Sequence, residues 1–137
     1  MNRRAFLRIV DANYNRAKEA LRVAEDFSRF LLNDRRLTAR FKRSRHELTR
    51  ILLRLPIPYR RLVAARDSVR DVGRSRGIRD RRSPRWQDAM TANLKRAEEA
   101  LRVLEELARL ISPRAARSFE DLRFRIYELE RIAFQKF

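Results

Sequence analysis

The sequence predicts an all-α protein in which internally duplicated helical hairpins form a four-helix bundle with a long crossover. Residues 11–30 and 91–110 align without a gap and share 11 of 20 residues, which indicates an internal repeat. The chain has only two glycines and four prolines in 137 residues, and Ala, Leu, Arg and Glu dominate it, which favours helix. Cap residues precede two of the prolines, where helices are expected to begin.

Apolar residues recur at helical spacing in four long segments. We expect helices at about 3–32, at about 35–55 after the Asn33–Asp34 break, from Ser83–Pro84, and from Ser112–Pro113. Aligning Phe41 with Phe119 extends the duplication from one helix to a hairpin. The sequence therefore predicts one helical domain over 1–137, with repeat one at 3–55 and repeat two at 84–137.

The crossover at 56–83 differs from the rest of the chain. It holds both glycines, three aspartates and nine arginines, and a short helix is expected at 59–66. A connection of this length without strong periodicity is more often a functional loop or a linker than plain scaffold.

Composition limits the function classes. The absence of cysteine excludes a disulfide scaffold, a thiolate zinc site and a cysteine nucleophile, and the single histidine, His46, leaves little room for metal clusters. Because no apolar run approaches the ~20 residues of a membrane span, we expect a cytoplasmic protein without a membrane partner. The net charge is +17, and arginine dominates the 35 cationic residues. This charge favours anionic ligands, and arginine suits bidentate binding of phosphate or carboxylate.

Several polar residues lie on helix faces that should be apolar. They are Asn13, Arg16, Arg45, Asn93, Arg96, Arg123 and Glu130. An unpaired charge in a dry core costs several kcal/mol, so these groups must pair with each other, lie at a subunit interface or line a wet pocket. We expect them to bind a phosphorylated small molecule. The alternative is a set of buried Arg–Glu and Asn–backbone pairs that fix helix register.

Five blocks of the sequence resemble a known family. They are RIVDANYNRAKEALRVAEDFSRF, KRSRH, AARDSVRDVG, TANLKRAEEALRVLEELARL and LRFRIYELE, and their order is kept over nearly the whole chain. The family is the monofunctional hydroxymethylpyrimidine-phosphate kinase domain that is often fused N-terminal to thiamine-phosphate synthase. Its members commonly read ARDTxGDxG in the crossover, whereas this chain has Ser68 and, in place of a glycine, Arg70.

The resemblance implies ATP-dependent phosphorylation of 4-amino-5-hydroxymethyl-2-methylpyrimidine phosphate to the diphosphate, with Mg²⁺, in thiamine biosynthesis. Thiamine-phosphate synthase is then an expected partner, and a homo-oligomer is also expected. On positions that match the family motifs we assign catalysis to Arg66 and Asp67, and Mg²⁺ binding to Asp67 and Asp71. We assign substrate binding to Asn13, Arg16, Arg45, Asn93, Arg96 and Arg123.

Two other function classes stay open. A basic helical protein that binds nucleic acid would explain the charge directly, although the aromatic residues fall mostly at core spacing. A cofactor-free helical enzyme of chorismate-mutase type would also bind a dianion with arginines from several helices.

Overall fold

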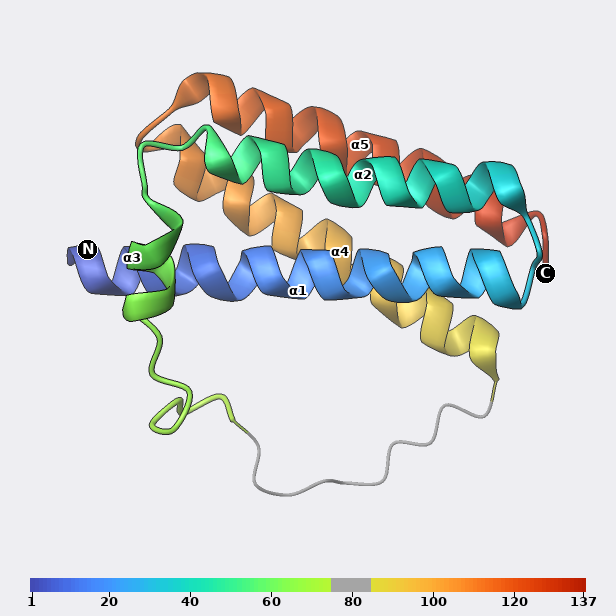
Figure 1. Ribbon diagram of the computed structural model, residues 1–137, viewed down its shortest axis with the longest axis horizontal. Coiled ribbons are helices and arrows are strands. Elements are labelled where there is room, and N and C mark those ends of the chain that lie inside the picture. The colour runs from blue at the N-terminus through green and yellow to red at the C-terminus, as the bar shows by residue number, and fades with distance from the viewer. Residues whose placement is uncertain (75–84) are drawn as a thin grey trace.

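The computed structural model describes residues 1–74 and 85–137, and every regular element within them is helical. The helices are α1 (Arg3–Phe30), α2 (Arg35–Leu53), α3 (Tyr59–Ala64), α4 (Trp86–Arg109) and α5 (Pro113–Phe134). Figure 1 shows that the two hairpins are α1–α2 and α4–α5, with α3 in the connection between them. The predicted all-α fold is confirmed.

Local sequence explains where the helices begin. The side chains of Asn2, Asp34 and Ser112 accept hydrogen bonds from the backbone N–H groups three residues further on, which satisfies donors that a helix leaves open at its start. The predicted start of the third long helix at Ser83–Pro84 lies outside the described residues. Within them, α4 begins at Trp86 with Arg85 before it.

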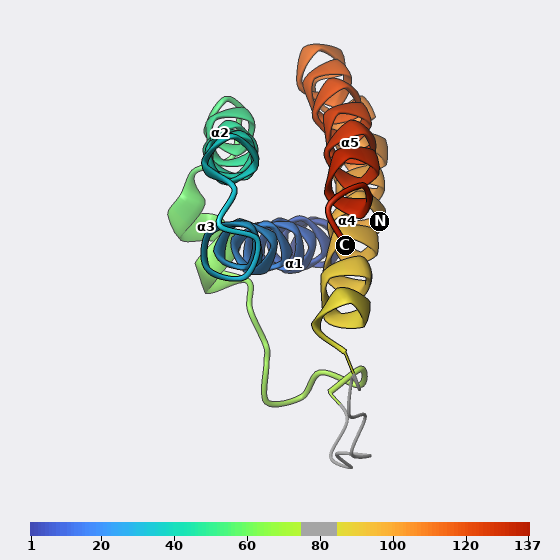
Figure 2. The ribbon, with the colours of Figure 1, turned by 90° about the vertical axis from the view of Figure 1, so that its right-hand side faces the viewer.

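The four long helices form a closed arrangement, because α1 packs on α2 and α4, and α5 packs on the same two helices. The short helix α3 packs on α1, on the side away from α4 (Figure 2). Phe41 of α2 and its repeat counterpart Phe119 of α5 are both fully buried. Burying a side chain of this size contributes about 1.5–3 kcal/mol, so the two copies supply matching anchors to one core.

Each hairpin is also held by a buried ion pair. Arg45 of α2 donates from Nε to Glu25 of α1 at 2.8 Å. In the second copy, Arg123 of α5 donates to Glu105 of α4 at 2.9 and 3.1 Å. Because Glu25 and Glu105 are repeat counterparts, the pair belongs to the duplicated unit and not to one hairpin alone.

None of the helices within the described ranges is both long and apolar enough to cross a membrane.

Candidate functional site

The crossover is fastened to α1 by a pair between Asp11 and Arg66. Arg66 follows α3 directly, and its Nε and one terminal nitrogen donate to the two carboxylate oxygens of Asp11 at 2.6 and 2.8 Å. Asp11 is 4% exposed, and the side chain of Asn15, one turn along α1, donates to its backbone carbonyl. The hydrogen bonds and charge of Asp11 raise the pKa of Arg66 above its usual value. This bidentate pair fixes the guanidinium in place.

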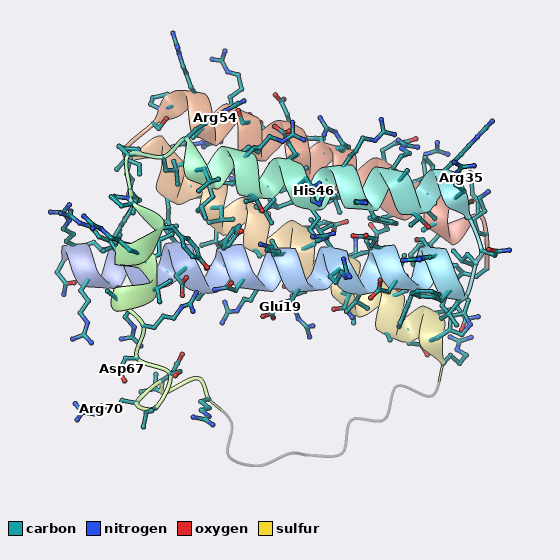
Figure 3. All side chains as sticks on the ribbon, in the orientation of Figure 1. Glu19, Arg35, His46, Arg54, Asp67 and Arg70 are labelled. Carbon is teal, nitrogen blue, oxygen red and sulfur yellow. The ribbon has the colours of Figure 1, made fainter. Side chains whose placement is uncertain are left out.

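A hollow of about 420 Å³ opens beside this pair. Its lining comes from one face of α1 and from the start of the segment after α3: Arg8, Asp11, Ala12, Asn15, Glu19, Arg66, Asp67, Ser68 and Asp71. Figure 3 shows Glu19 on the side of α1 from which the crossover descends, with Asp67 near the top of that segment. The site is therefore built between a rigid helix and a loop.

A second hollow, of about 280 Å³, adjoins the first and shares Arg8, Ala12 and Asp71 with it. It adds Asn13 and Arg16 from α1. Asn13 is 5% exposed, and its side-chain nitrogen donates one N–H to the carbonyl of Ile9 at 2.9 Å, so its amide oxygen and its second N–H remain to contact a ligand. Five of the predicted site residues thus come together along α1: Asn13, Arg16, Arg66, Asp67 and Asp71.

The charge of the site differs from the expected arginine-rich interior. The two hollows contain arginines and carboxylates in similar numbers, and Arg66 already neutralises Asp11. The guanidinium of Arg4 lies 3.8 Å from the carboxylate of Asp67. The remaining lining groups are cationic at Arg8 and Arg16 and anionic at Glu19 and Asp71. Such a surface fits a ligand that carries both a phosphate and hydrogen-bond donors or positive charge.

The two aspartates assigned to Mg²⁺ accept hydrogen bonds from the backbone of their own loop. Asp67 accepts a hydrogen bond from the backbone N–H of Arg70 at 3.2 Å, and Asp71 accepts one from that of Gly73 at 2.9 Å. Within residues 1–74 and 85–137, no three or more acidic or histidine side chains gather to hold a metal ion. Mg²⁺ at Asp67 and Asp71, and ATP, stay predictions.

The other predicted site residues lie elsewhere. Arg45 and Arg123 form ion pairs with Glu25 and Glu105 inside the hairpins. This is the alternative in which buried Arg–Glu pairs fix helix register. Asn93 and Arg96 lie on α4, where Asn93 donates to the carbonyl of Ala89 and accepts from Arg96 at 3.2 Å, and neither lines the two hollows.

The predicted inward direction of two arginines is wrong. Arg16 and Arg96 are exposed. Both stand at the edge of an apolar stripe, and the long side chain lets the charged end reach solvent while its stem covers apolar surface.

Sequence reasoning missed Asp11, Arg8, Asn15 and Glu19 as site residues. Asp11 has no acidic counterpart in the second copy, where Thr91 stands. A search for polar residues shared by both repeats could not find it. Its one signal in the sequence is its place inside the RIVDANYNRAKEALRVAEDFSRF block.

Comparison with known proteins identifies the family. A family model described as the ThiD2 family matches residues 8–132. The chain belongs to the ThiD2 family. The matched range includes all the lining residues of the two hollows that are named above, and it leaves out Arg4.

Similar proteins are named thiamine-phosphate synthase. One from Synechocystis sp. is 40% identical over 127 residues, which is 92% of this chain and 35% of the relative. Others, from Nostoc punctiforme and Rhodopirellula baltica, are 39% and 37% identical over 90% of this chain and cover 34% and 33% of those proteins. This ThiD2-family chain therefore spans about a third of the length of these relatives. No solved structure matches it.

These names correct the activity expected from the sequence. The relatives that match most of the chain are named as synthases of thiamine phosphate and not as pyrimidine kinases. The predicted phosphorylation of 4-amino-5-hydroxymethyl-2-methylpyrimidine phosphate is therefore wrong.

Proposed function

We propose that the chain is a transferase-type enzyme domain of thiamine biosynthesis, and that the site between α1 and the crossover binds a phosphorylated intermediate of that pathway. The observation that carries the proposal is the Asp11–Arg66 pair, which holds a guanidinium at the wall of a hollow of about 420 Å³. Arg66 remains 42% exposed, so nitrogen not used by Asp11 is left to bind a phosphate oxygen.

The mixed charge of the hollows points to the kind of phosphate ester. Thiamine phosphate, which the relatives' name specifies, joins a phosphate to a cationic ring and an aminopyrimidine. A phosphate fits Arg66 and Arg8, whereas an amino group or a cationic ring fits Asp71, Glu19 and the amide oxygen of Asn13. A simple polyphosphate would meet the carboxylates unfavourably.

The share of the relatives that this chain covers supports different functions for this domain and for the remaining part of those proteins. About two thirds of each relative has no counterpart in the aligned chain. We propose that the domain handles a phosphorylated intermediate while a polypeptide that resembles the remaining part of the relatives acts as its partner.

Calorimetric titration with thiamine phosphate and with thiamine tests the site. We expect the phosphorylated ligand to bind at least about tenfold more tightly, because charge-assisted hydrogen bonds to phosphate contribute about 1.5–3 kcal/mol. Arg66→Ala should remove that preference. Arg70→Ala is the matched control, since Arg70 is exposed in the same segment and does not line either hollow. Equal binding of both ligands, or an unchanged preference in Arg66→Ala, would contradict the proposal.

A second candidate rests on α2. The side chains of Arg35, Arg36, Lys42 and Arg43 are exposed, and no ion pair is formed by them within the described part of the chain. Figure 3 labels Arg35 and Arg54 near the two ends of this helix. Such a face suits the phosphate backbone of a nucleic acid, with binding that weakens steeply as salt rises. Titration of labelled duplex DNA at several salt concentrations tests it, and a salt-independent signal would exclude it.

A further inference from the structure

A larger hollow lies at a different place in the bundle. Its volume is about 470 Å³. It forms where α1 begins, where α2 connects to α3 and where α4 turns into α5, and Figure 1 shows these three segments meeting at one end of the molecule. The lining is shared by both repeats, whereas the site described above uses α1 and the crossover alone.

The lining of this end hollow is mainly apolar. Phe6 and Leu7 come from α1, Ile57 from the α2–α3 connection, and Leu110 and Ile111 from the α4–α5 turn. Leu110 is 67% exposed and Ile111 39% exposed, although Leu101 and Leu104 of the preceding helix α4 are buried. Apolar side chains gathered in a concave surface are typical of a small-molecule site of about 300–1,000 Å³.

The charged groups of the end hollow are of one sign. Arg3 and Arg61 contribute to the lining, and it contains no acidic residue. Both arginines are exposed, and within residues 1–74 and 85–137 neither forms an ion pair. An apolar surface with two unneutralised guanidinium groups complements a ligand that has an apolar body and a negative end.

We propose that the end hollow is a second binding site, which takes a small organic anion with a flat apolar ring and a carboxylate, sulfonate or phosphate group. The ring packs on Leu7, Ile57 and Ile111, and the anionic group pairs with Arg61 and Arg3. The volume fits a small molecule, and the two arginines select its charge. This site is separate from the Asp11–Arg66 site, although Arg61 in α3 and Arg66 just after α3 are close in the sequence.

Amide NMR titration with naphthalenesulfonate, and with the neutral naphthalenemethanol as its uncharged counterpart, tests the proposal. We expect saturable shifts of Ile57, Leu110 and Ile111, and tighter binding of the sulfonate. Arg61→Ala should weaken the sulfonate about tenfold and leave the alcohol unchanged. Arg60→Ala is the matched control, because Arg60 is an exposed neighbour on the same short helix and does not line the hollow.

Three results would overturn the proposal. The first is a set of amide shifts that do not saturate or that lie outside the lining residues. The second is sulfonate binding to Arg61→Ala that is as tight as binding to the wild-type chain. The third is a dimer, seen by light scattering, that Ile111→Glu converts to a monomer, which would identify the occupant as a second copy of the chain. Titration of thiamine phosphate into Arg61→Ala separates the two sites, because its binding should not change even if the end hollow binds nothing.

Discussion

The two hairpins share their scaffold and differ in their chemistry. Both place a glutamate of the first helix against an arginine of the second, as Glu25–Arg45 and Glu105–Arg123. Both also use an asparagine, Asn13 or Asn93, to donate to the carbonyl one turn earlier. The duplication therefore preserved residues that hold helices together.

The ion pair of the candidate site depends on a residue that the repeats do not share, whereas several lining residues are identical in both copies: Ala12, Asn13, Arg16 and Glu19. Asp11 of the first copy binds Arg66, whereas its counterpart Thr91 donates to the carbonyl of Gln87 at 2.9 Å. Only the first hairpin is followed by the crossover that supplies Arg66. The comparison teaches that an internal repeat locates the core efficiently, and that the Asp11–Arg66 pair arises where the two copies differ.

The largest expected effect is on stability, where replacing the two buried glutamates, Glu105 and Glu25, should have different costs. Glu105 is fully buried and binds Arg102, Arg109 and Arg123, so Glu105→Ala leaves three guanidinium groups without their shared partner. We expect a loss of about 3–5 kcal/mol in the free energy of unfolding, the range for breaking a buried pair. Urea denaturation followed by circular dichroism measures it.

The first copy is the control for this experiment. Glu25 is 8% exposed in its side chain, and Arg45 is 14% exposed, so water can replace part of the lost interaction. Glu25→Ala should cost less than Glu105→Ala. An equal or larger cost in the first copy would show that burial does not set the difference.

Repeat-equivalent arginines should differ in ligand binding. Arg16 lines the hollow of about 280 Å³, and Arg96 does not line either hollow of the site. Arg16→Ala should weaken thiamine phosphate about tenfold by removing a charge-assisted contact, whereas Arg96→Ala should leave its affinity unchanged. Calorimetry on both variants checks this, and equal losses would mean that the two copies contribute alike.

A smaller expected effect is the pH dependence of stability that Glu98 causes. Burial raises the pKa of Glu98 to about 7, and Lys95 partly opposes the rise. Its repeat counterpart is Lys18, whose Nζ donates to the hydroxyl of Tyr14 at 3.0 Å. The folded chain holds the proton of Glu98 more tightly than the unfolded chain does. The contribution of this protonated side chain to stability is therefore present below about pH 4.5 and is lost as pH rises to about 7.

Glu98→Gln tests that linkage. The free energy of unfolding of the wild type should fall by on the order of 2 kcal/mol between pH 5 and pH 7.5 relative to the variant, while the variant keeps the neutral form throughout. Parallel pH profiles of the two proteins would show that Glu98 does not titrate in this range.

Helices and caps were predictable from particular residues. Asp34 and Ser112 cap helices at the expected places, and Phe41 and Phe119 are buried at matching positions. The direction of Arg16 was not predictable, because a residue at the edge of a stripe can turn either way when its side chain is long. The Asp11–Arg66 contact joins residues 55 positions apart, and no periodicity relates a helix to an irregular crossover.

By itself the sequence determined an all-α chain and its hairpin duplication, since helix propensity, capping and apolar spacing are local properties. The tertiary structure decided which polar groups neutralise each other. Whether an arginine binds a glutamate, stands in solvent or faces a hollow depends on the elements packed beside it. That is why Arg45 and Arg123 each join the two helices of their own hairpin, and why Asp11, unremarkable in the sequence, holds Arg66 at the site.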